Sequence, residues 1–121
     1  MQSTILLIDD NAVQAAIRQT ILKRAGYVVI AVLDPKRALE QIRTEGAAVI
    51  ELVITDHLMP GMNGAAFVKA LRTTHPALPV LVISGLDEAE AEYDGLGVTF
   101  RQKPLPPDHL LASVHRLMRT H

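Results

Sequence analysis

The chain has 121 residues, which suits one domain of common size, and hydrophobic residues make up 49% of it, enough for a core. The formal net charge of −1 argues against a general binder of nucleic acid or of membrane surfaces. There is no cysteine, which excludes disulfides and thiolate chemistry and is compatible with a reducing compartment. The apolar stretches are far shorter than the ~20 residues of a membrane helix, and no signal peptide is indicated, so we expect a cytoplasmic α/β domain.

Short apolar runs alternate with helical patterns five times along the chain. Their enrichment in Val and Ile favours strands. The predicted strands cover Ile5–Ile8, Val28–Val32, Leu52–Thr55, Val80–Ile83 and Val98–Gln102. Because these runs are continuously apolar rather than alternating, we expect strands that are buried on both faces, as in a parallel sheet.

The first predicted helix follows the first strand. It begins at Asn11, a good N-cap, with Gln14 three residues later as its capping-box partner, and it ends at Gly26. Apolar residues follow at helical spacing, namely Val13, Ile17 and Ile21.

The later helices have start and stop signals of their own. Asp34 is the N-cap of the second, with Pro35 at the first helical position and an end near Gly46. The third runs to His75-Pro76, and Asp87–Asp94 is short of large apolar residues, which predicts only a short and weakly anchored helix. The last helix is amphipathic, with Leu110, Leu111, Val114, Leu117 and Met118 on its apolar side.

This alternation predicts a flavodoxin-like (βα)₅ fold. Its doubly wound parallel sheet has the strand order 2-1-3-4-5, and we expect a single domain that spans residues 1–121. Right-handed crossovers leave few other topologies. The ligand site of such a fold lies outside the carboxyl ends of the strands, where the winding reverses. Polar residues that directly follow a strand are therefore the first candidates for the site.

Five such residues follow four of the predicted strands: Asp9, Asp10, Asp56, Ser84 and Lys103. The adjacent carboxylates of Asp9 and Asp10 repel each other, which costs stability unless a cation neutralises them. Mg²⁺ is the predicted cofactor, because it takes oxygen ligands and usually one or two carboxylates plus phosphate. Taken alone, the Asp9-Asp10 pair is also compatible with a turn that caps a helix. The addition of Asp56 makes that alternative weaker.

The same residues predict phosphoryl chemistry. A carboxylate oxygen of Asp56 beside Mg²⁺ can attack a phosphoryl group and form an aspartyl phosphate. The Lys103 ammonium suits a phosphoryl oxygen, and the Ser84 hydroxyl can donate a hydrogen bond to another. Gly85 leaves room for the group. Alone, Ser84-Gly85 is a common turn and Lys103 a surface lysine, so the prediction depends on the whole set.

At these positions the chain resembles response-regulator receiver domains of two-component signalling. The segments that carry the resemblance are Leu6–Asn11, Asp56–Gly64, Val82–Gly85 and Phe100–Leu105. The resemblance implies that Asp56 is the phosphoacceptor and that the phosphohistidine of a histidine kinase or of a histidine phosphotransfer domain is the donor. It also implies that Mg²⁺ is held by Asp9, Asp10, Asp56 and the backbone carbonyl of Leu58.

The resemblance implies two further features. Ser84 and Phe100 match the residues that switch conformation in the family, although Phe100 is equally compatible with plain packing at the sheet edge. A cis peptide bond is expected before Pro104, since X–Pro bonds are where cis occurs.

The chain also departs from the family pattern. The segment between Ser84 and Lys103 is shorter than in the DNA-binding regulators, and the loss falls on the fourth helix. In this respect the chain is more similar to receivers of hybrid sensor kinases or to single-domain regulators. Leu58 and Leu86 stand two residues beyond Asp56 and Ser84, where other members often carry polar side chains that handle the hydrolytic water.

Two other functions stay open. One is a binding module that works without phosphorylation, and the other is a phosphatase or phosphotransferase with an aspartyl-phosphate intermediate. Such an enzyme needs a second carboxylate near the nucleophile and a cap, and nothing in the sequence pairs His57 as a base. We therefore expect a signalling domain rather than an enzyme in its own right. Its partners are expected to be proteins, with neither direct nucleic-acid binding nor membrane contact.

Overall fold

The computed structural model describes residues 4–45 and 50–119, and it has the predicted alternation of strands and helices. The elements are, in chain order, β1 (Thr4–Ile8), α1 (Ala12–Arg24), β2 (Val28–Val32), α2 (Pro35–Glu45), β3 (Ile50–Asp56), α3 (Gly64–Arg72), β4 (Val80–Ser84), η1 (Asp87–Tyr93), β5 (Thr99–Gln102) and α4 (Pro107–Arg119). The described part of the chain contains no helix that is long and apolar enough to span a membrane.

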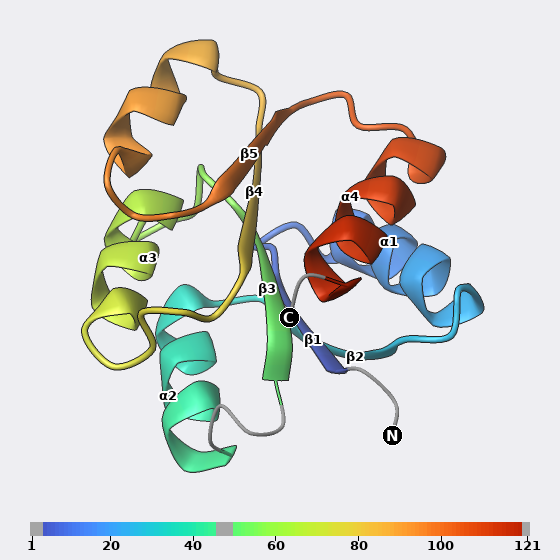
Figure 1. The fold of residues 1–121 in the computed structure, drawn as a ribbon, viewed down its shortest axis with the longest axis horizontal. Coiled ribbons are helices and arrows are strands. Elements are labelled where there is room, and N and C mark those ends of the chain that lie inside the picture. Colours follow the sequence, from blue (N-terminus) through green and yellow to red (C-terminus); the bar gives the residue numbers. More distant parts are fainter. Residues whose placement is uncertain (1–3, 46–49, 120–121) are drawn as a thin grey trace.

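The strands form one parallel sheet in the order β2-β1-β3-β4-β5, which confirms the predicted doubly wound fold. Helices α1 and α4 cover one face of the sheet, and α2, α3 and η1 cover the other (Figure 1). The residues of β1 and β4 are buried throughout, as are those of β3 apart from Glu51, whereas β2 and β5 at the two edges are partly exposed. The prediction of burial on both faces is therefore confirmed for β1, β3 and β4, but it is wrong for the apolar run of β2, which lies at the edge of the sheet.

Each face of the sheet has its own hydrophobic cluster. Leu6, Phe67 and Val82 belong to the cluster under α2, α3 and η1. Leu7, Leu22 and Val114 belong to the cluster under α1 and α4. Burial of both clusters is the main term that stabilises the sheet and fixes the ends of its strands.

The first helix has the predicted bounds, but its buried side differs from the apolar stripe seen in the sequence. Val13 is 70% exposed and Ile17 is 56% exposed, while Ala15 and Leu22 are buried. Helical spacing predicted the helix correctly. The spacing alone does not say which side of the helix packs on the sheet.

Other boundaries differ from the prediction as well. Helix α3 ends at Arg72, before His75-Pro76, and β5 begins at Thr99. The predicted end of α2 near Gly46 lies outside the described residues. Residues Asp87–Tyr93 form a 3₁₀ helix, η1, which is anchored more firmly than its composition predicted, because Ala89 and Tyr93 are buried.

Candidate functional site

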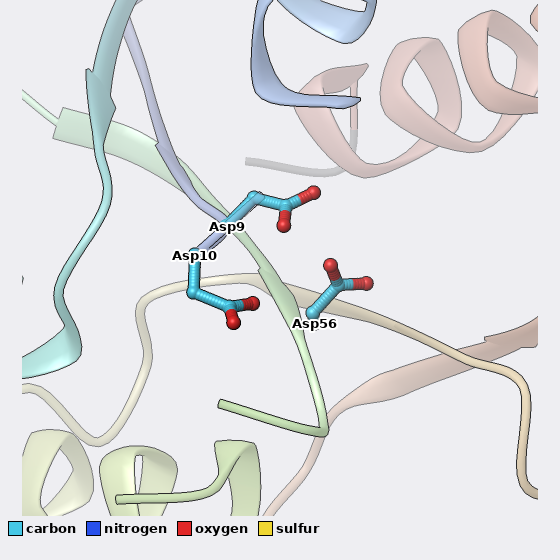
Figure 2. A group of neighbouring side chains, drawn as sticks. All are labelled: Asp9, Asp10 and Asp56. Carbon is cyan, nitrogen blue, oxygen red and sulfur yellow. The ribbon is translucent and has the colours of Figure 1, made fainter. Parts of the chain in front are cut away.

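Three carboxylates meet at the carboxyl ends of β1 and β3. Strand pairing sets Ile8 beside Thr55, so Asp9 and Asp56 directly follow neighbouring strand positions. Carboxylate oxygens of Asp9, Asp10 and Asp56 all lie within 4.8 Å of one another (Figure 2). Asp9 and Asp56 are buried and Asp10 is exposed, so the cluster is open to solvent on the side of Asp10.

Lys103 reaches the same cluster from the end of β5. Its Nζ lies 3.0 Å from Asp56 Oδ1. The backbone N–H of Lys103 donates to the Ser84 carbonyl at 2.8 Å, which fixes the start of this segment against β4. The peptide bond between Lys103 and Pro104 is cis, as the resemblance implied. The structure therefore brings together the four charged residues that the sequence singled out.

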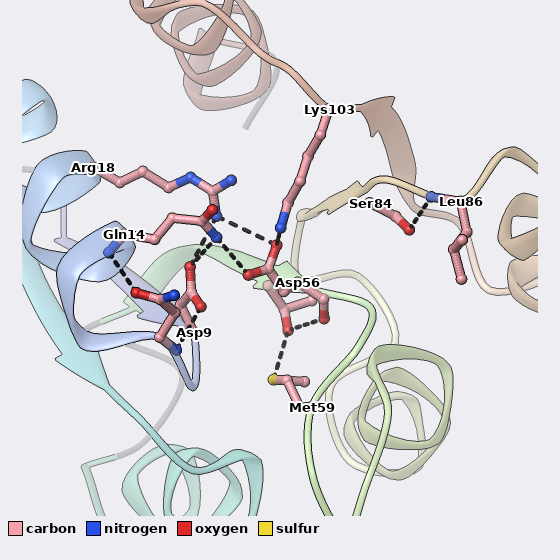
Figure 3. A network of polar contacts seen from close by, with 10 residues as sticks. Asp9, Gln14, Arg18, Asp56, Met59, Ser84, Leu86 and Lys103 are labelled. Atoms are coloured by element: carbon pink, nitrogen blue, oxygen red, sulfur yellow. Dashed lines mark hydrogen bonds and ion pairs between the residues drawn. The ribbon is translucent and has the colours of Figure 1, made fainter.

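The site also contains two residues that the sequence analysis missed, Gln14 and Arg18 of α1 (Figure 3). Gln14 Nε2 donates to Asp9 Oδ2 at 2.6 Å and to Asp56 Oδ2 at 2.9 Å. Arg18 Nη1 lies 3.2 Å from Asp9 Oδ2 and 3.4 Å from Asp56 Oδ1. The sequence could have indicated both residues, because Gln14 and Arg18 are four apart in a helix that begins beside Asp9, and residues at this spacing share one face.

The helix cap next to the site is only half as predicted. Asn11 Oδ1 accepts a hydrogen bond from the Gln14 backbone N–H at 3.0 Å, as an N-cap does. The expected return bond from the Gln14 side chain to Asn11 is wrong. The Asn11 N–H instead donates to Asp9 Oδ1 at 2.9 Å, and the Gln14 amide is used on the two carboxylates.

The pKa of the Asp56 carboxyl is raised to about 6. Burial is the largest cause, followed by the interaction with the nearby Asp9 carboxyl, which favours the protonated form of Asp56. Arg18 and Lys103 act in the opposite direction, because positive charge favours the ionised form. The two basic side chains therefore offset only part of the effects that raise the pKa of Asp56.

The acid cluster fits a hard divalent cation. It offers carboxylate oxygens from three residues within reach of one point, one of them exposed, and Mg²⁺ prefers such oxygen donors and retains several waters. A cation there would offset the repulsion from Asp9 that adds to burial in raising the pKa of Asp56. The described residues place no sulfur or imidazole ligand in this group.

Ser84 lies at the end of β4, but its hydroxyl faces away from the acids. Ser84 Oγ accepts a hydrogen bond from the Leu86 backbone N–H at 3.0 Å (Figure 3). Phe100 is partly buried and its ring lies 5.8 Å from that of Tyr93. Leu58 is 63% exposed and Leu86 is 37% exposed, so both side chains stand at the surface of the loops that border the site.

His57 has partners that the sequence did not reveal. It is buried, its Nδ1 lies 2.7 Å from the Tyr93 hydroxyl, and its Nε2 lies 3.3 Å from a Glu92 carboxylate oxygen. Burial raises the pKa of the Tyr93 hydroxyl, which therefore stays neutral. These contacts connect the residue after Asp56 to η1 rather than to the acids. They anchor the loop and do not provide a catalytic base.

Comparisons with known proteins agree with this geometry. The family described as "Response regulator receiver domain" matches residues 5–115. The transcriptional regulatory protein ZraR of Escherichia coli (strain K12) is 33% identical over 97% of this chain and 27% of its own length. The alkaline phosphatase synthesis transcriptional regulatory protein PhoP of Bacillus subtilis (strain 168) is 30% identical over 98% of this chain and 50% of its own length.

The solved structures give the same result. The chemotaxis protein CheY4 of Vibrio cholerae superimposes with a TM-score of 0.87 at 29% identity, over 97% of this chain and 99% of that one. The chain spans half or less of the two transcriptional regulators but almost all of CheY4. The family match covers nearly the whole chain, and Asp9, Asp10, Asp56 and Lys103 lie within the matched residues. The chain therefore belongs to the response-regulator receiver domains of two-component signalling.

Proposed function

We propose that this receiver accepts a phosphoryl group on Asp56 from the phosphohistidine of a histidine kinase or of a histidine phosphotransfer domain. One observation carries the assignment. Asp56 Oδ1 lies 3.0 Å from Lys103 Nζ, and carboxylate oxygens of Asp9 and Asp10 lie within 4.8 Å of an Asp56 oxygen. A nucleophilic carboxylate, a phosphate-binding cation and a divalent-cation site are thus adjacent. We further propose that residues 1–121 form one such unit.

In this reaction an Asp56 oxygen attacks phosphorus, the new O–P bond forms, and the N–P bond of phosphohistidine breaks, leaving imidazole to take up a proton. Asp9, Asp10 and Asp56, with the backbone carbonyl of Leu58, would hold Mg²⁺. When bound, Mg²⁺ supplies positive charge that lowers the repulsion between the carboxylate and the phosphoryl group. Lys103 pairs with a phosphoryl oxygen and holds the group in line, so positioning and charge supply most of the catalysis.

Ser84 and Phe100 would report the phosphoryl group to the surface. The Ser84 hydroxyl now accepts from the Leu86 N–H, and it must turn to donate to a phosphoryl oxygen. That turn releases Leu86 at the start of η1. Phe100 contacts Tyr93 at the end of the same helix, so both residues are in a position to move with η1.

The partners are proposed to be proteins. Val13 and Ile17 are exposed apolar side chains on α1, one turn apart, on the helix that supplies Gln14 and Arg18 to the site. A phosphodonor that docks there would bring its histidine near Asp56. We expect no direct nucleic-acid contact by this domain and no catalytic turnover of generic phosphate esters. The cytoplasmic location stays a prediction.

Phosphorylation is tested by intact-mass measurement after incubation with acetyl phosphate. The parent should gain one phosphoryl mass in MgCl₂ and none in EDTA. Asp56→Asn should gain none, because its amide is not a nucleophile. Asp34→Asn removes an exposed N-terminal cap acid of the same charge and is the matched control, which should be phosphorylated like the parent. A phosphoryl mass retained on Asp56→Asn would show that another residue is the acceptor.

A further inference from the structure

Two side chains of α1 bridge the same pair of buried acids. The Gln14 amide spans Asp9 and Asp56 with bonds of 2.6 and 2.9 Å. One turn later, the Arg18 guanidinium spans them at 3.2 and 3.4 Å. Figure 3 shows both side chains reaching from α1 over the acids, opposite Lys103. The Arg18 side chain is only 11% exposed, so this is a buried contact and not a surface ion pair.

These donors use the carboxylate oxygens that a cation shared by Asp9 and Asp56 would need as ligands. Mg²⁺ held by this cluster would take carboxylate oxygens of Asp9 and Asp56 as ligands, directly or through its waters. Gln14 Nε2 already donates to one oxygen of each of these acids. The amide and the ion would therefore compete for the same oxygens. Gln14 would have to give up these acceptors before both oxygens could serve one ion.

The balance of charge also favours the displacement of Arg18 when the ion binds. When ionised, Asp9, Asp10 and Asp56 carry three negative charges, and Lys103 and Arg18 carry two positive charges beside them. With Mg²⁺ added, positive charge exceeds negative charge. The ion and the guanidinium would then repel each other at a separation of a few ångströms, where screening by solvent is weak.

The displaced side chains have somewhere to go. A groove beside the site lies between α1 and the segment that follows β5, and Gln14, Arg18, Ile17, Lys103 and Leu105 help to line it. Gln14 and Arg18 already border this groove.

We propose that the Arg18 guanidinium is an internal counter-ion, assisted by hydrogen bonds from the Gln14 amide, that closes the cation site of the resting domain, and that Mg²⁺ binds by displacing both side chains. The inference rests on the proposed function, since it takes the acid cluster to be a Mg²⁺ site. It adds two residues that lower the affinity for the ion. They thereby set the Mg²⁺ concentration at which the domain becomes competent for phosphorylation.

The alternative is that both side chains only fasten α1 to the sheet. In that case their removal would loosen the acids and would weaken or leave unchanged the binding of Mg²⁺. The two explanations therefore differ in the sign of the effect on metal affinity, which is measured without phosphorylation.

Calorimetric titration of MgCl₂ into the unphosphorylated domain separates them. Arg18→Met keeps the apolar stem and removes the charge, and it should bind Mg²⁺ about 10-fold more tightly, which equals about 1.4 kcal/mol. Gln14→Leu removes no charge and should still tighten binding severalfold. Arg24→Met removes one exposed charge from the last turn of the same helix and is the matched control, which should bind like the parent.

A second measurement does not depend on variants. In the parent, the side-chain nitrogen signals of Arg18 and Gln14 should shift when MgCl₂ is added, while those of Arg24 stay in place. The counter-ion proposal is wrong if the Mg²⁺ affinity of both Arg18→Met and Gln14→Leu is equal to or lower than that of the parent. It is also wrong if the Arg18 and Gln14 signals do not move when MgCl₂ is added. Either result leaves the phosphoacceptor proposal standing. Absence of Mg²⁺ binding in the parent and in every variant overturns both.

Discussion

Gly64, the first residue of α3, is expected to tolerate no side chain. A Cβ placed there would meet the Tyr93 hydroxyl oxygen at a forbidden separation, the Asp56 carbonyl oxygen at 2.7 Å and His57 Cα at 3.1 Å. The Gly64 N–H also donates to the His57 carbonyl at 2.7 Å, which holds the helix start against this loop. Gly64→Ala must therefore push apart α3, η1 and the end of β3.

The magnitude follows from opposing terms. Overpacking of a buried position costs about 1–3 kcal/mol, and displacement of Tyr93 breaks its bond to His57, at about 1 kcal/mol. Replacement of Gly by Ala within a helix gains up to about 1 kcal/mol. We expect the free energy of unfolding to fall by about 2 kcal/mol. Since the Asp56 backbone is one of the groups displaced, the rate of phosphorylation should fall as well.

Urea unfolding followed by circular dichroism, in the absence of Mg²⁺, measures the loss. Gly85→Ala is the control, because a Cβ at Gly85 meets nothing within 4 Å and its φ is not positive. It should change the free energy of unfolding by less than about 1 kcal/mol. Tyr93→Phe combined with Gly64→Ala should recover only part of the loss, since the contact with the Asp56 carbonyl remains. If Gly64→Ala unfolds at the same urea concentration as the parent, the close approach of α3 to β3 is wrong.

Three other predictions test the site. Lys103→Ala should leave Mg²⁺ binding largely intact but destabilise the phosphorylated form by about 1–2 kcal/mol, because a charge-assisted bond is lost from a side chain that is 34% exposed. If phosphorylation shifts the NMR signals of this variant as much as those of the parent, Lys103 does not have this role. Leu58→Asn or Leu86→Glu should speed loss of the phosphoryl group about 10-fold, or about 1.4 kcal/mol of barrier, by positioning water. The decay is followed after removal of the donor, and fast decay in the parent, or no acceleration in either variant, would rule this explanation out. Tyr93→Phe should lower the free energy of unfolding in urea by about 1–2 kcal/mol, because it leaves buried His57 Nδ1 without its partner, and an unchanged midpoint would show that water replaces the hydroxyl.

The sequence alone determined the order of strands and helices. It also predicted that four charged side chains lie close together at one edge of the sheet, namely those of Asp9, Asp10, Asp56 and Lys103. Apolar runs of Val and Ile separated by helical patterns allow few topologies, and parallel strands necessarily end at one edge. A residue that directly follows a strand is thereby placed to within the spacing of the sheet. This is why local signals were sufficient for these four residues.

Only the tertiary structure decided which side chains form hydrogen bonds and ion pairs with these acids. Gln14 was predicted to cap its own helix and instead bridges Asp9 and Asp56, because the rotation of α1 on the sheet turns that face of the helix toward β1 and β3. The same rotation exposes Val13 and Ile17. Helical spacing gives the helix but not its rotation, which depends on how Leu22 and its neighbours fill the space above the sheet.

The contact between His57 and Tyr93 likewise could not be predicted from the sequence. The two residues are far apart in the chain, and the composition of Asp87–Tyr93 predicted a weakly anchored segment. Only the packing of η1 against α3 and β5 buries Tyr93 and brings its hydroxyl to the imidazole. Sequence patterns report the faces of single elements, whereas a buried polar pair between elements depends on how those elements are placed relative to one another.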